Sequence, residues 1–133
     1  MPDPRPPLPA KQTLVLILLP ILATVFSLRL YLHLVHVRHI YPGGYLVHHL
    51  FVGVLIVVPA ALLLAFGTRH RVLARVALGL GTGLILDEVV YLVATQASDA
   101  DYVSRTSLVG SLVLVSLAVV FLLVLYSLHR DET

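Results

Sequence analysis

The chain has 133 residues, of which 59% are hydrophobic and 12% are charged, with a formal net charge of +2. Soluble domains carry about 25% charged residues, so this composition argues against a soluble protein and favours a membrane protein. The absence of cysteine excludes disulfides, thiolate metal sites, cysteine nucleophiles and covalently attached haem. This net charge is too small to indicate a nucleic-acid-binding protein.

Four long apolar segments follow a Pro-rich tail at 1–12, which we expect to be extended or disordered because prolines interrupt helices. We predict transmembrane helices at about 13–39, 45–66, 72–95 and 106–129. A turn containing Pro42-Gly43-Gly44 follows the first helix, and a short tail, 130–133, follows the last. Short connections place successive helices antiparallel, so the fold class is an all-α, polytopic four-helix membrane bundle.

Lysine and arginine are distributed unequally between the two ends of the predicted bundle. Six of them share the side of the N-terminus: Arg5, Lys11, Arg69, Arg71, Arg75 and Arg130. The opposite side holds Arg38 and Arg105. Because cytoplasmic loops carry the excess of positive charge, we expect an N-in/C-in multi-pass protein of the cell (inner) membrane.

Most ionisable side chains within the apolar segments fall at one depth. The three groups, one in each of the first three helices, are Arg29, His33 and His36; His48 and His49; and Asp87, Glu88 and Tyr91. Alternating helix directions bring the groups together at the extracytoplasmic end. Charged groups are costly in hydrocarbon and usually mark a functional site.

Helical spacing distinguishes members of these groups. The first group has i, i+4, i+7 spacing, which is a single stripe of a helix. A second stripe repeats every four residues through Gly79, Gly83, Asp87 and Tyr91. Glycines at this spacing allow close helix approach, so we expect Asp87 inside the bundle. Serines in the last helix, including Ser107 and Ser111, predict a small-residue packing wall.

Imidazole and carboxylate side chains are the ligand types of zinc, iron and manganese. We therefore expect a divalent metal held by residues from three helices: His48 or His49, His33 or His36, and Asp87. Glu88 is expected to act as general base. Arg29 is expected to hold an anionic headgroup or one of the carboxylates, and Tyr91 to donate a hydrogen bond to the site.

The run His48-His49-Leu50-Phe51-Val52-Gly53, with Asp87-Glu88 on the next helix, carries a family resemblance. It resembles small uncharacterised prokaryotic integral membrane proteins with HHxxxG and DE motifs on successive helices. The resemblance spans the second and third helices. It implies that these four polar residues act as one unit, and it implies no particular activity.

Four functions stay open at this point. The first is a metal-dependent hydrolase acting on a lipid or lipid-linked substrate in the bilayer. The second is a haem b electron carrier, with axial ligands such as His33 and His48. The third is a proton or ion transporter that uses the His/Asp/Glu groups. The fourth is a non-enzymatic accessory subunit of a membrane complex; a homo-oligomer is also open, and the sequence does not decide whether the protein is an enzyme.

Overall fold

The computed structural model describes residues 8–35, 48–66, 70–96 and 99–130. The elements in these ranges are all helices: α1 Ala10–Leu34, α2 His49–Phe66, α3 Arg71–Ala94, α4 Asp99–Tyr102 and α5 Arg105–His129. Four of them, α1, α2, α3 and α5, are long and apolar enough to cross a membrane. Even α2, with 18 residues, reaches about 27 Å at the helical rise of ~1.5 Å per residue, close to the hydrocarbon thickness of ~30 Å.

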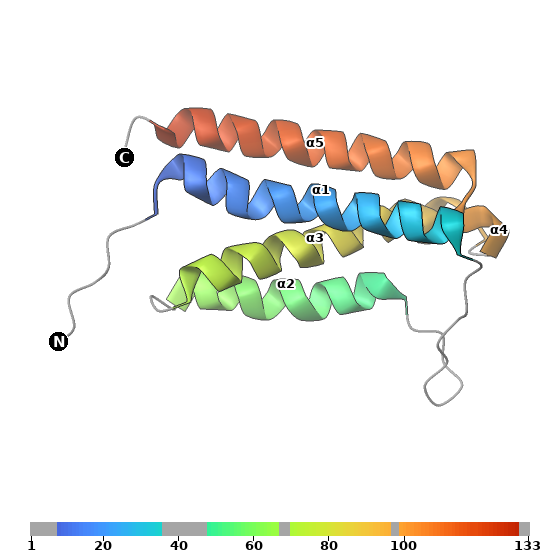
Figure 1. The fold of residues 1–133 in the computed structure, drawn as a ribbon, viewed down its shortest axis with the longest axis horizontal. Helices are drawn as coiled ribbons and strands as arrows, with labels where there is room; N and C mark the ends of the chain where they lie inside the picture. The colour runs from blue at the N-terminus through green and yellow to red at the C-terminus, as the bar shows by residue number, and fades with distance from the viewer. Residues whose placement is uncertain (1–7, 36–47, 67–69, 97–98, 131–133) are drawn as a thin grey trace.

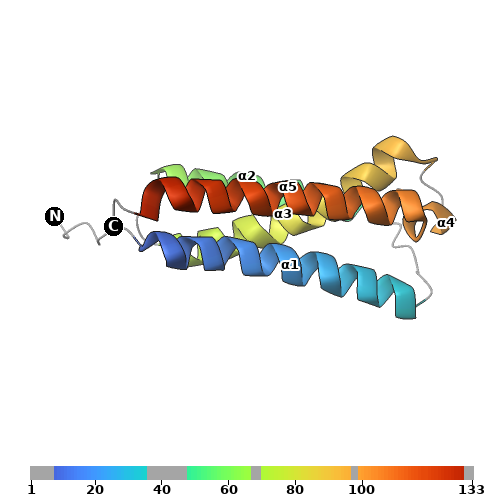
Figure 2. The same cartoon turned by 90° about the horizontal axis from the view of Figure 1, so that it is seen from above.

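The long helices alternate in direction along the chain, as Figures 1 and 2 show. The start of α1 and the end of α5 therefore lie at the same end of the bundle. The opposite end, where α1 and α3 finish and α2 and α5 begin, also holds α4. We call it the α4 end. Helix α3 contacts α1, α2 and α5, and it has more buried positions than any of them.

Helix α1 differs at both ends from the predicted segment. It begins at Ala10, directly after Pro9, because a proline blocks helix only for the residues before it and lacks an N–H that a helix start leaves unpaired. It ends at Leu34, since Val35 is extended. Pro20 lies within the helix without ending it. The predicted helical positions 36–39 and 45–47 lie outside the described residues.

Glycines set the closest approaches to α3. A Cβ on Gly83 would lie 2.8 Å from Cβ of Thr24 and 3.0 Å from the carbonyl oxygen of Ile21, both on α1. Gly53 and Gly81 oppose each other, because a Cβ on either would lie 2.7 Å from the carbonyl oxygen of the other. Small residues thus let α3 touch the backbones of α1 and α2, as in close-packed membrane helices.

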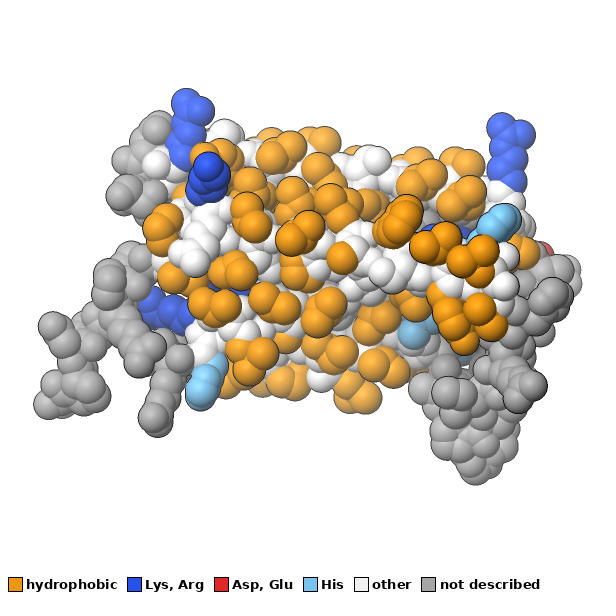
Figure 3. Space-filling model, viewed as in Figure 1, with side chains coloured by type: hydrophobic (Ala, Val, Ile, Leu, Met, Phe, Trp, Pro, Cys, Tyr) orange, Lys and Arg blue, Asp and Glu red, His pale blue; other side chains and the backbone are white. Residues whose placement is uncertain are grey.

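The outer surface of the bundle is mostly apolar. Leu19, Phe26, Leu55, Leu117 and Phe121 are all more than half exposed. Figure 3 shows apolar side chains across the middle of one face and Lys or Arg side chains toward its two ends. This distribution suits a surface that meets lipid in the middle and water at both ends, and it is compatible with a multi-pass membrane protein.

Candidate functional site

Four polar residues from two helices meet near the α4 end of the bundle. His48 directly precedes α2 and His49 begins it, while Asp87 and Glu88 lie in the last two turns of α3. Asp87 has no exposed surface and Glu88 is 3% exposed. We call these four residues the His–carboxylate cluster. The glycine stripe on α3 correctly predicts that Asp87 lies inside the bundle.

The Asp87 carboxylate has hydrogen-bond partners on several helices. Nε of Arg29 donates to its Oδ1 at 2.5 Å, and the hydroxyl of Ser111 lies 3.5 Å from the same oxygen. The Tyr102 hydroxyl donates to Oδ2, and Nε2 of His49 lies 3.3 Å from that oxygen. These partners come from α1, α2, α4 and α5. The Asp87 carboxylate therefore links α3 to each of the other helices in the described chain.

Arg29 acts as a clamp whose donors are engaged within the protein. Besides Nε, its Nη1 donates to the carbonyl oxygen of Tyr102 at 3.0 Å and to Oγ of Ser107 at 3.2 Å. Its Nη2 donates to the backbone oxygen of Asp87 at 2.8 Å and to the same Ser107 oxygen. A guanidinium has five N–H donors, and these contacts leave little capacity for an external anion. Of the two expected roles of Arg29, the structure favours contact with a carboxylate.

Glu88 caps the start of α2. The backbone N–H of Leu50 donates to Oε2 at 2.6 Å, and Nδ1 of His48 lies 2.7 Å from Oε1. The first N–H groups of a helix have no partner within it, and a carboxylate there also meets the positive end of the helix dipole. Within the described chain, Glu88 is paired with histidines and with no lysine or arginine.

His49 lies between the two acids. Its Nε2 is 3.3 Å from Oδ2 of Asp87, and its Nδ1 is 3.3 Å from Oε2 of Glu88. A neutral imidazole has one N–H, so it can donate to only one of these carboxylates. The Arg29 charge offsets Asp87, whereas Glu88 has imidazoles as its side-chain partners. Among the described residues one arginine therefore faces two carboxyl groups, so the cluster lacks one compensating positive charge unless Glu88 or a histidine is protonated or another cation binds.

Tyr91 and Tyr102 pack against the histidines of the cluster and against each other. The rings of Tyr91 and Tyr102 pack edge to face with centroids 5.0 Å apart. Tyr91 also lies against His48 at 6.2 Å, and Tyr102 against His49 at 5.8 Å. Burial raises the pKa of the Tyr102 hydroxyl, and the negative charge of Asp87 raises it further. Tyr102 therefore stays protonated and donates to Asp87.

Sequence reasoning missed the roles of Tyr102 and the two serines. Tyr102 stands in a short polar connection with no helical periodicity, so no sequence pattern marks it. Ser107 and Ser111 are buried in α5, as a packing wall requires, but their hydroxyls also contact Arg29 and Asp87. The helical spacing of these serines is the signal that the sequence offers. It does not identify the group that each hydroxyl contacts.

The structure brings together most of the predicted site residues. Those in contact with one another are Arg29, His48, His49, Asp87, Glu88 and Tyr91. His33 is exposed and lines a pocket between α1 and α5 instead, and His36 lies outside the described residues. Among the residues described, no three His, Asp or Glu side chains are arranged around a common point as ligands of a metal ion would be.

No protein-family model, curated protein or solved structure matches this chain. The cluster geometry and the helix arrangement are therefore the grounds on which a function can be proposed.

Proposed function

We propose that this chain is an integral membrane protein whose His–carboxylate cluster binds a divalent metal ion at the extracytoplasmic end of the bundle. One observation carries the proposal: Glu88 is buried against His48 and His49 with no cationic side chain beside it in the described structure. A buried carboxylate without a compensating charge is unfavourable. A bound cation would compensate it.

The donor chemistry supports a transition metal. Two imidazoles and one carboxylate form a ligand set used by zinc enzymes. Asp87 beside the other nitrogen of His49 matches the partner that orients a metal-ligating histidine. This assignment exchanges the expected roles of the two acids: Glu88 becomes a ligand, and Asp87 becomes a positioning residue.

The four side chains hydrogen-bond to one another rather than surround a common point. Metal binding would therefore replace the contacts of His48 and His49 with Glu88 and would release any proton shared there. When bound, a metal in this set could act as a Lewis acid on a lipid or lipid-linked substrate. Hydrolysis of such a substrate is the catalytic form of the proposal.

Metal analysis of the detergent-purified full chain tests the proposal. We expect wild type to bind close to one zinc or manganese ion per chain by elemental analysis and calorimetry. Glu88→Gln should abolish binding, and Asp87→Asn should weaken it by roughly 10–100-fold, as loss of an orienting partner does. His129→Ala is the matched control, because this exposed histidine lies at the opposite end of the bundle. Absence of saturable binding, or equal binding by Glu88→Gln, overturns the proposal.

A second candidate is proton exchange, which a different observation favours. A continuous set of contacts runs from His48 through Glu88, His49 and Asp87 to Tyr102. A protonated imidazole between the acids would supply the missing positive charge. A protein without bound metal, whose proton flux in liposomes is lost on Glu88→Gln, would favour this candidate over the first.

The haem b alternative has less support from the geometry. The exposed His33 lines the pocket between α1 and α5, so the structure does not bring it together with His48, the other expected axial ligand. A visible spectrum of the same purified sample tests it directly. We expect no Soret band.

A further inference from the structure

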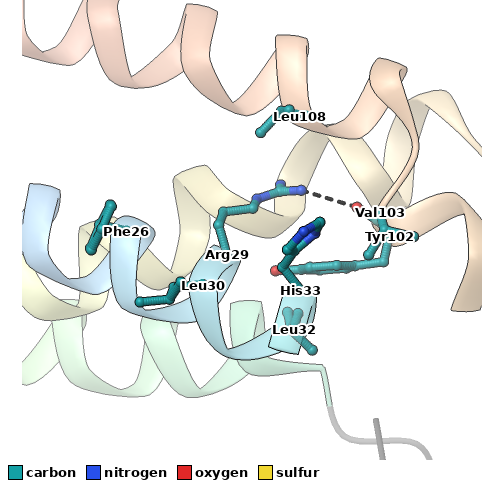
Figure 4. A pocket seen from close by; sticks show the side chains of 8 residues that line it. All are labelled: Phe26, Arg29, Leu30, Leu32, His33, Tyr102, Val103 and Leu108. Atoms are coloured by element: carbon teal, nitrogen blue, oxygen red, sulfur yellow. Dashed lines mark hydrogen bonds between the residues drawn. The ribbon is translucent and has the colours of Figure 1, made fainter. Parts of the chain in front are cut away.

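A cavity of about 300 Å³ lies between α1 and α5, beside the cluster. Five of its lining residues are apolar: Phe26, Leu30, Leu32, Val103 and Leu108. The others are Arg29, His33 and Tyr102, and Figure 4 shows these three near the α4 end of the cavity while the Phe26 and Leu30 side chains lie on the side away from α4. Ligand pockets have volumes of roughly 300–1,000 Å³, so the cavity suits part of a ligand.

The surroundings of this cavity restrict its occupant. Phe26 and Leu108 are exposed on helices long and apolar enough to span a membrane, so the cavity opens on a surface suited to lipid. Arg29 lies five residues before the end of α1, about 8 Å along the axis at the helical rise. His33, one residue before the end of α1, lies nearer that end and therefore close to the expected level of lipid headgroups.

The polar side of the cavity offers a hydrogen-bond donor rather than a free charge. The Arg29 guanidinium is engaged by Asp87 and Ser107, and it lies over the Tyr102 ring at 4.7 Å. His33 presents an exposed imidazole at this end. An occupant that matches both sides is amphiphilic, with a hydrocarbon chain for the walls and a polar head for His33.

We propose that this cavity binds a membrane phospholipid. One acyl chain lies along α1 and α5 against Phe26, Leu30 and Leu108, and a headgroup oxygen accepts a hydrogen bond from His33. This binding does not require a metal in the cluster.

Tyr102 connects the cavity to the cluster. Its ring lines the cavity, while its hydroxyl donates to Asp87 and its ring edge meets His49. The head of a bound lipid would therefore lie one side chain away from His49. The inference that this lipid is the substrate of the cluster rests on the proposed metal site, whereas occupancy of the cavity does not.

Native mass spectrometry of the detergent-purified full chain, titrated with phosphatidylglycerol in buffer containing EDTA, tests the proposal. Leu108→Trp fills the cavity, and we expect its apparent affinity for the retained lipid to fall by roughly tenfold or more because the site becomes overpacked. Leu123→Trp is the matched control, since Leu123 lies outside the cavity on the same helix and is 46% exposed against 42% for Leu108. Circular dichroism checks that both variants keep the helical content of wild type.

His33→Ala, with His129→Ala as its control, tests the head position. We expect the phosphatidylglycerol affinity to fall several-fold for the first variant and to stay unchanged for the second. Equal lipid retention by Leu108→Trp and Leu123→Trp would show general detergent-phase association and overturn the proposal. Full retention by His33→Ala would overturn the placement of the headgroup. Because EDTA removes metal, these results are independent of the test of the metal site.

Discussion

Nε of Arg29 lies 2.5 Å from Oδ1 of Asp87, and this ion pair joins α1 to α3 through a fully buried carboxylate. The same guanidinium reaches Ser107 on α5 and the backbone of Tyr102. A buried charge pair is stable only when its remaining donors and acceptors are also satisfied. The contacts of Arg29 and Asp87 meet that condition, and they tie three of the long apolar helices together.

Removal of one member of this pair should destabilise the protein more than removal of both. We expect Arg29→Met to lower the free energy of unfolding by about 3–5 kcal/mol, because Asp87 is left buried without its partner. The double variant Arg29→Met/Asp87→Leu should lose less than the sum of the two single changes. Reversible unfolding in mixed detergent measures each value. Arg105→Met, an exposed arginine at the same end, should change little; additive effects of the two buried changes would contradict the coupling.

The contact between Gly53 and Gly81 should tolerate no side chain. In Gly81→Ala the new Cβ meets the carbonyl oxygen of Gly53 at 2.7 Å, and backbone cannot yield there as a flexible side chain could. We expect a loss of about 1–3 kcal/mol from overpacking, despite the gain of about 1 kcal/mol in helix propensity. Thermal unfolding in detergent measures the loss. The neighbouring exposed position supplies the control Leu80→Ala, and a Gly81→Ala protein as stable as wild type would refute the close contact.

Tyr102→Phe keeps the ring and removes the hydroxyl that donates to Asp87. We expect a loss of about 1–3 kcal/mol, since a buried carboxylate loses one of its donors. Tyr31→Phe, at an exposed tyrosine of α1, should cost almost nothing. Equal stability of the two variants would argue against the Tyr102–Asp87 hydrogen bond.

The same tyrosine predicts a pH dependence at alkaline pH. Burial and the Asp87 charge raise the folded-state pKa of Tyr102 above the ordinary value of 10.0. A raised pKa means that the folded protein holds this proton more tightly than the unfolded chain. The stabilising contribution is therefore fully present below pH 10, and it is lost as the pH rises through the folded-state value. Tyrosinate absorbance of wild type should show an ionisation above pH 10 that Tyr102→Phe lacks; identical absorbance titrations of the two proteins would contradict it.

The distribution of arginines predicts which end of the bundle faces the cytoplasm. Because the chain contains no cysteine, single cysteines report topology without background. We expect Gln96→Cys to react with a membrane-impermeant maleimide in intact cells, or in spheroplasts where an outer membrane is present. His70→Cys should react only after permeabilisation. Both positions are exposed and lie at opposite ends of α3. Labelling of His70→Cys alone in intact cells would reverse the N-in/C-in assignment.

The four long helices, and the meeting of polar residues at one end of the bundle, could be predicted from sequence alone. Apolar length is a one-dimensional property, so α1, α2, α3 and α5 are readable without a structure. Helical spacing also predicts that Asp87 faces the interior, because a glycine stripe leads to it. These features depend on distance along one helix, which is fixed by the backbone geometry.

Which side chains meet depends on helix packing, and a sequence pattern does not specify that packing. Arg29 and His33 share one stripe of α1, yet the long Arg29 side chain reaches Asp87 while His33 stays exposed. Glu88 caps α2, His49 lies between two acids, and Tyr102 enters from α4, a four-residue helix with no sequence signature. Periodicity fixes the angle of a residue about its own helix axis. It does not fix the reach of a side chain or the group that it meets on another helix, because those depend on how the helices pack.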